Sequence, residues 1–138
     1  MRMLIRGLLA AGTLVLTPVY AHHSFAMFDQ SQEKSLVGVV KEFQWTNPHA
    51  FIHIEVASPG SAPEVWDIEL NSPNNLKRSG WKADSVKPGD KVTLVTNPLR
   101  DLSQHKGGLF VSVTLPDGKV LGDATRAGRS GPINVPTP

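Results

Sequence analysis

The 138-residue sequence contains no cysteine. Disulfides, thiolate metal ligands, a cysteine nucleophile and a lipid anchor on cysteine are therefore excluded. In an oxidising compartment such a domain depends on its hydrophobic core alone.

A membrane-spanning apolar run is also missing. The longest apolar stretch, residues 7–19, follows Arg2 and Arg6 and is shorter than the roughly 20 residues that a bilayer span needs. It ends in Val19-Tyr20-Ala21, a small-residue exit typical of signal peptidase cleavage. We predict that residues 1–21 are a signal peptide, that the mature chain begins at His22, and that the protein is periplasmic or secreted. A buried N-terminal helix is the alternative.

Once this segment is removed, the chain has no excess of either positive or negative charge. Without Arg2 and Arg6, twelve basic and twelve acidic residues remain. A neutral domain lacks the electrostatic footprint of a nucleic-acid or membrane-surface binder. We expect no nucleic-acid partner and no membrane insertion after cleavage.

What the sequence does contain is period-two alternation of apolar residues, which predicts strands. The expected strands are residues 36–45, 50–56, 64–70, 91–96 and 109–115, with a short sixth at 119–121. One helix is expected at 72–79, where Ser72 can cap it and Gly80 can end it. Three strands, a helix and two strands is the order of an OB-fold. We therefore predict an all-β, OB-fold-like barrel of five to six strands, with a small β-sandwich as the alternative.

The alternation also predicts which side chains share a face. In the first strand Val37, Val39, Phe43 and Trp45 are in phase, and in the third Trp66, Ile68 and Leu70 point inward.

Three segments complete the predicted organisation. Residues 22–35 are expected to dock on the barrel through Phe25, Met27 and Phe28, and residues 36–121 form the barrel itself. The Gly- and Pro-rich residues 122–138 are expected to be a disordered tail.

Several motifs occur together: His-His-Ser-Phe-Ala-Met-Phe-Asp from His22, Trp-Thr-Asn-Pro-His-Ala from Trp45, Pro-Gly-Asp-Lys-Val from Pro88 and Asn-Pro-Leu-Arg from Asn97. With them the chain resembles a family of small exported proteobacterial proteins of unknown function. The resemblance implies export and a single β domain, and it implies no activity.

Chemistry, if there is any, is expected among the histidines. No nucleophile elbow, phosphate-binding glycine loop or zinc-protease helix is present, so we expect no enzyme. Cleavage after Ala21 places an α-amine and an imidazole on His22, and these two nitrogens can chelate a metal. One further imidazole would give a three-nitrogen set that suits Cu(II). Cleavage one residue earlier would instead make His23 the third residue, which also chelates Cu(II).

The second imidazole is predicted to come from His49, which is favoured because side chains can converge at the Asn-Pro-His corner. His105, in the loop between the fourth and fifth strands, is a further candidate. His49 and His53 would lie about 13 Å apart on a straight strand, too far to share one metal. His53 is interpreted as a surface residue beside Glu55. The predicted metal residues are thus His22, His23, His49 and His105, with copper as the metal. The alternative is that His22 and His23 are part of an N-terminus that binds no metal.

The sequence favours an exported, non-enzymatic binding or accessory domain that binds copper. A metal-free interaction subunit of an exported enzyme or envelope assembly, using Trp81 and the tail for contact, is the first alternative. The second is a glycan or small-molecule binder that stacks ligands on Trp45, Trp66 and Trp81, although Trp66 is predicted to lie in the core and a core position is also favoured for Trp45 and Trp81. Asp67 and Glu69 are expected to be solubilising charges on an exposed strand face.

Overall fold

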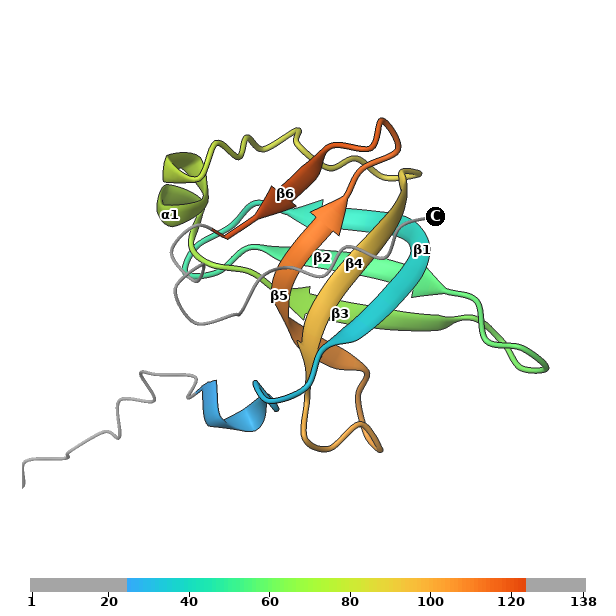
Figure 1. Cartoon of the computed structure of the whole chain (residues 1–138). Coiled ribbons are helices and arrows are strands. Elements are labelled where there is room, and N and C mark those ends of the chain that lie inside the picture. Colours follow the sequence, from blue (N-terminus) through green and yellow to red (C-terminus); the bar gives the residue numbers. More distant parts are fainter. Residues whose placement is uncertain (1–24, 124–138) are drawn as a thin grey trace, which may run out of the picture.

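Six strands and one short α-helix make up residues 25–123, the part of the chain that the computed structural model describes (Figure 1). The predicted signal peptide, His22, His23 and the residues after Asp123 lie outside it. None of the helices in the described part has the length and apolar character needed to cross a membrane. The elements are η1 (Phe25–Met27), β1 (Lys34–Gln44), β2 (Phe51–Val56), β3 (Glu64–Glu69), α1 (Pro73–Arg78), β4 (Lys91–Pro98), β5 (Gly107–Thr114) and β6 (Val120–Gly122).

The strands close into a barrel. β1, β2 and β3 form an antiparallel meander, and β1 also pairs with β4, which in turn pairs with β5. Parallel pairing of β3 with β5, with Asp67 opposite Gly107, completes the closure, and β6 adds to β5. This closed five-stranded arrangement with a helix between the third and fourth strands is that of an OB-fold, so the predicted fold class is confirmed.

The barrel interior is filled by the residues that alternation places inward. Trp66, Ile68 and Leu70 of β3 and its continuation are buried, as predicted. The helix begins where expected, because the Ser72 side chain accepts a hydrogen bond from the Asn75 backbone N–H across 3.4 Å. The core as a whole comprises Leu36, Val40, Ala50, Ile52, Ile54, Trp66, Ile68, Leu70, Leu76, Trp81, Val86, Val92, Leu94, Phe110, Val113 and Leu121.

The alternation of β1 is broken by a β-bulge between Val40 and Glu42. Leu36 and Val40 point inward before the bulge, and Phe43 packs against the core after it. Val37 is 69% exposed, so the prediction that it shares a face with Phe43 is wrong. The extra residue at the bulge shifts the alternation of side chains by one position. A prediction that assumes unbroken alternation therefore places one half of the strand on the wrong face.

The turn before β4 holds this bulge in place. The Val40 backbone N–H donates to the Asp90 carbonyl across 2.9 Å, and the Gly89 N–H donates to the Val40 carbonyl across 2.8 Å. Gly89 has a φ of 92°, a backbone conformation that glycine adopts without strain. The Pro-Gly-Asp turn therefore fixes β1 as well as delivering the chain into β4.

Residues ahead of β1 continue along the end of β4. The Asp29 N–H donates to the Pro98 carbonyl across 2.8 Å, and Phe28 forms an antiparallel bridge with Leu99. Phe28 is buried. The N-terminal segment is thus bound to the loop that joins β4 to β5, which lies beside η1 in Figure 1.

The tail was predicted to begin at residue 122, and here the structure differs. Gly122 belongs to β6, and Asp123 is buried.

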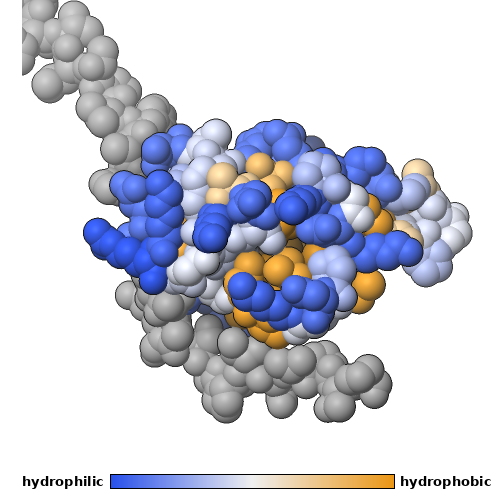
Figure 2. Space-filling model, turned by 90° about the horizontal axis from the view of Figure 1, so that it is seen from above, coloured by the Kyte–Doolittle hydropathy of each residue, from blue (hydrophilic) through white to orange (hydrophobic). Residues whose placement is uncertain are grey.

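Apolar surface remains at the exposed side chains of Phe25, Met27, Val37, Val65 and Val120. On the face shown in Figure 2 the apolar surface is interspersed with hydrophilic residues.

Candidate functional site

The outer face of β2 and β3, with the two loops beside it, brings the three histidines of residues 25–123 close to carboxylates. Because successive strand residues point to opposite faces, Phe51 and His53 project outward from β2. They lie opposite Glu69 and Asp67 of β3, respectively. The loop before β2 carries His49, and the loop between β4 and β5 adds another imidazole. In OB-folds this face and these two loops form the usual ligand-binding surface.

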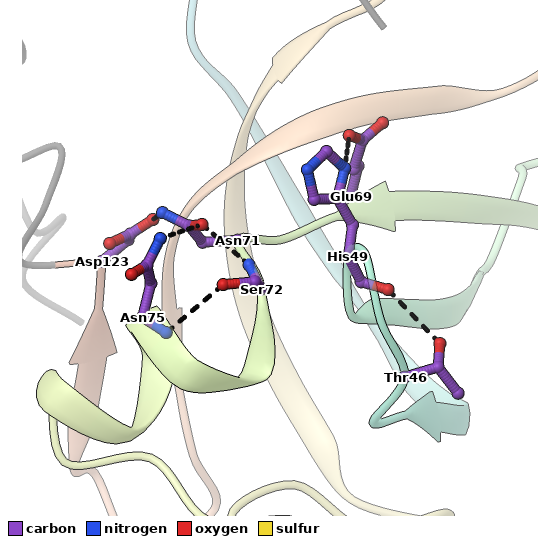
Figure 3. Close-up of polar contacts among 7 residues, drawn as sticks. All are labelled: Thr46, His49, Glu69, Asn71, Ser72, Asn75 and Asp123. Carbon is purple, nitrogen blue, oxygen red and sulfur yellow. Dashed lines mark hydrogen bonds and ion pairs between the residues drawn. The ribbon is translucent and has the colours of Figure 1, made fainter. Parts of the chain in front are cut away.

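His49 forms an ion pair with Glu69 at one end of this face (Figure 3). Its Nδ1 lies 2.5 Å from Glu69 Oε1, and its carbonyl accepts a hydrogen bond from the Thr46 hydroxyl across 3.3 Å. Glu69 is only 8% exposed, so the expectation of a solubilising surface charge is wrong for this residue. A carboxylate removed from water needs a partner, and His49 supplies it.

A polar network beside this pair secures the end of β3. Asn71 Oδ1 accepts hydrogen bonds from the Ser72 N–H across 2.7 Å and from Asn75 Nδ2 across 2.8 Å. Asn71 Nδ2 donates to Asp123 Oδ2 across 3.3 Å (Figure 3). These contacts join β3, α1 and the end of β6, and we assign them a structural role.

Asp67 contacts two imidazoles at once. Its Oδ1 accepts a short hydrogen bond from His53 Nδ1, and its Oδ2 lies 3.2 Å from His105 Nε2. Asp67 was expected to be a solubilising charge, and its side chain is instead partly buried between these partners. His105 comes from the loop before β5, so the site joins residues that are distant in sequence.

His53 is more enclosed than the sequence predicted. It lies on the outward face, yet its side chain is only 22% exposed, and its ring stacks on Phe51 with centroids 6.3 Å apart and 15° between planes. Its Nε2 is buried and has no hydrogen-bond partner in the described part of the chain. A proton on Nε2 would be a buried donor without an acceptor, which favours the neutral ring with its proton on Nδ1.

The loop that carries His105 is fixed at its base. The Asp67 backbone N–H donates to the Lys106 carbonyl across 3.0 Å, and the Leu99 N–H donates to the Gly107 carbonyl across 3.0 Å. The His105 side chain itself is 56% exposed. An exposed imidazole on an anchored loop is accessible to a ligand without unfolding of the barrel.

The predicted metal residues are therefore distributed as follows. The structure places His105 with His53 around Asp67, and it places His49 with Glu69. No group of three or more His, Asp or Glu side chains within residues 25–123 is arranged to hold a metal ion. His22 and His23 lie outside the described residues.

The tryptophans do not form the predicted binding platform. Trp81 is 2% exposed, so its proposed roles in partner contact and ligand stacking are wrong. Trp45 is partly buried and packs edge-on against Phe43, with centroids 5.5 Å apart. Both rings belong to the packing of the barrel.

Comparison with known proteins places the chain in a family. A family model for a family of unknown function matches residues 11–109. The chain belongs to this family, DUF6152. The prediction that the chain belongs to a family of unknown function is thereby confirmed. No curated protein matches the chain.

Among solved structures, the DUF6152 chain is similar to the crystal structure of a mitochondrial single-stranded DNA-binding protein from S. cerevisiae. The two are 14% identical, with a TM-score of 0.46. The match covers 62% of this chain and 93% of that one.

The charges on the outer face of this DUF6152 domain are mainly acidic. Glu42 lies opposite His53 on the β1 side, and Asp67 and Glu69 follow on the β3 side. The nearby lysines are already paired: Lys41 Nζ lies 3.4 Å from Glu55, and Lys106 Nζ lies 3.8 Å from Glu64. Three carboxylates with imidazole neighbours attract cations and repel phosphate groups.

Proposed function

We propose that this protein is an exported, non-enzymatic domain that binds copper beside the outer face of the barrel, with His22 and His105 as ligands. The α-amine and imidazole of His22 and the imidazole of His105 would supply three nitrogens, a set suited to Cu(II). The proposal includes cleavage of the predicted signal peptide after Ala21, because only then does His22 carry a free amine.

The observation that carries the proposal is the docking of the N-terminal segment on the His105 loop. The Arg100 backbone N–H donates to the Met27 carbonyl, and Arg100 Nε donates to the Ala26 carbonyl, each across 3.0 Å. His22 lies three residues before Phe25, a span of about 10 Å at most for an extended chain. The contacts with Arg100 thus hold Ala26 and Met27, four and five residues after His22, against the loop that carries His105, and this supports His22 as a partner of His105.

His105 is favoured over His49 as the second ligand. His49 already compensates the buried Glu69, and a metal that took this imidazole would compete with that ion pair. His105 is more exposed and belongs to the loop on which the N-terminal segment docks. The acidic character of the outer face also favours a cationic ligand.

The test is native mass spectrometry of the protein exported by its own signal peptide, with one equivalent of Cu(II) and a competing chelator. The mass reports both the cleavage site and the bound metal. We expect a chain that starts at His22 and retains one copper, loss of copper in His105→Ala, and retention in His49→Ala. A chain that starts elsewhere, or one that releases copper as readily as a peptide of residues 22–29, would refute the proposal. Loss of copper in His49→Ala alone would show that His49 is the second ligand.

A further inference from the structure

Asp67 holds the His105 loop through both its backbone and its side chain. The backbone N–H donates to the Lys106 carbonyl across 3.0 Å, and Oδ2 lies 3.2 Å from His105 Nε2. An ionised carboxylate offers only lone pairs, so its approach favours the forms of His105 that carry a proton on Nε2. The lone pair of a neutral His105 is then on Nδ1.

Asp67 is in turn held by His53. The two residues are directly opposite on neighbouring strands, and His53 Nδ1 donates to Oδ1, which leaves Oδ2 for His105. The His53 ring cannot easily turn away, because it stacks on Phe51 and its Nε2 is buried. The carboxylate therefore has a fixed orientation that originates in the rigid β2–β3 pair rather than in the loop.

We infer that Asp67 is a positioning residue for His105. Oriented by His53, it holds the exposed imidazole so that Nδ1 is the nitrogen presented to a metal. This inference rests on the proposed function for the identity of the metal. The contacts from His53 to Asp67 and from Asp67 to His105 are those of the described residues. A carboxylate behind a metal-bound imidazole fixes its tautomer and orientation and strengthens it as a ligand, and removal of such a partner typically lowers metal affinity 10- to 100-fold.

The neighbouring ion pair provides a matched control. Glu69 lies two residues from Asp67 on the same strand and also holds an imidazole, that of His49. Within residues 25–123 Glu69 forms its ion pair with His49 and none with His105, so a change at Glu69 alters the charge of the face without altering the support of the His105 ring. Asp67→Asn and Glu69→Gln remove the same charge and keep nearly the same shape.

The first measurement uses the metal-free protein. Long-range ¹⁵N–¹H correlation spectra of the imidazoles at pH 7.5 are expected to show the proton on Nδ1 of His53 and on Nε2 of His105. In Asp67→Asn, the preference of His105 for the Nε2 proton is expected to weaken, whereas in Glu69→Gln it is expected to persist. A His105 ring that carries its proton on Nδ1 in the wild-type protein would overturn the inference.

The second measurement is the Cu(II) affinity of the exported protein against a competing chelator, together with the electron paramagnetic resonance spectrum. We expect Asp67→Asn to bind 10- to 100-fold more weakly than wild type with altered copper hyperfine splitting. Glu69→Gln removes the same charge from the face and is expected to keep the wild-type spectrum and to lose less affinity than Asp67→Asn. If His105→Ala loses copper while Asp67→Asn matches wild type, the positioning role is refuted and copper binding stands. If neither His105→Ala nor Asp67→Asn weakens copper binding, the proposed function fails. The tautomer of His105 in the metal-free protein still decides the role of Asp67.

Discussion

The indole N–H of Trp81 donates to the carbonyl oxygen of Gly122 across 2.9 Å. The ring is buried after α1 and meets Phe110 edge-on, with centroids 5.4 Å apart. One core side chain therefore connects the segment after the helix to the strand β6, which lies outside the closed five-stranded barrel.

This contact predicts a cost for Trp81→Phe. The variant keeps an aromatic ring but leaves the Gly122 carbonyl without this donor and removes buried volume. We expect the free energy of unfolding to fall by about 1–3 kcal/mol, measured by urea denaturation followed by circular dichroism. Trp45→Phe is the control, because Trp45 is only partly buried. Equal losses in the two variants would contradict a special role for the Trp81 hydrogen bond.

His49 and His105 are predicted to differ in their effects on stability. His49→Ala leaves the carboxylate of Glu69 buried without its partner, and we expect a loss of about 1–3 kcal/mol in metal-free urea denaturation. His105→Ala removes a largely exposed side chain and is expected to change stability by less than about 0.5 kcal/mol. A larger loss in His105→Ala than in His49→Ala would show that the structural and ligand roles have been assigned the wrong way round.

Single-stranded DNA is predicted not to bind, despite the fold. Phosphates would meet Glu42, Asp67 and Glu69 on the face that OB-folds use for ligands, and the nearby lysines are paired. Fluorescence anisotropy with a labelled oligothymidine at physiological salt is expected to give a Kd weaker than about 100 μM. Micromolar binding that weakens steeply with salt would disprove this expectation.

Docking of the N-terminal segment is predicted to respond to acid through Asp29. Hydrogen bonds from the Ser31 hydroxyl, at 2.6 Å, and from its backbone N–H, at 3.2 Å, lower the pKa of Asp29 below its ordinary value of 3.8. The Arg100 guanidinium, 3.8 Å away, acts in the same direction. A lowered pKa means that the ionised group stabilises the fold above its ordinary pKa, and that this stabilisation is lost as the pH falls through the lowered value.

The measurement compares the Tm of wild type and Asp29→Asn across pH. We expect a constant difference from neutral pH down to about pH 5 and a shrinking difference in more acidic buffers. Asp84→Asn controls for the change in net charge. A difference between wild type and Asp29→Asn that grows in acid would contradict the assignment.

The strands and helix could be predicted because their signals are local. Alternation marks each strand, and Ser72 and Gly80 delimit the helix from positions next to it in sequence. A core position was favoured for Trp81 and is confirmed, but the local pattern signals it only weakly, because the burial depends on β6 and on core rings that approach only in three dimensions.

The candidate site was harder to predict for the same reason. Parallel pairing of β3 with β5 places Asp67 beside the end of the loop that carries His105, and no pattern within either segment signals that contact. Alternation did place Asp67 and His53 on outward faces. A register that pairs them directly could have suggested a histidine–carboxylate pair in place of two isolated surface residues.

The bulge between Val40 and Glu42 makes the number of residues in β1 as informative as their identity. Lys41 is exposed, and a point substitution there leaves both halves of the strand in phase. Deletion of Lys41 would remove the bulge and leave Phe43 and Trp45 facing the core, because Val40 and Glu42 already pair with consecutive residues of β2, whereas a further residue inserted beside Lys41 would turn them toward water. In this strand the number of residues between Val40 and Phe43, and not the side chain at Lys41, sets which face each half presents, so single-residue insertions are a more sensitive probe of how the barrel is encoded than substitutions at the bulge.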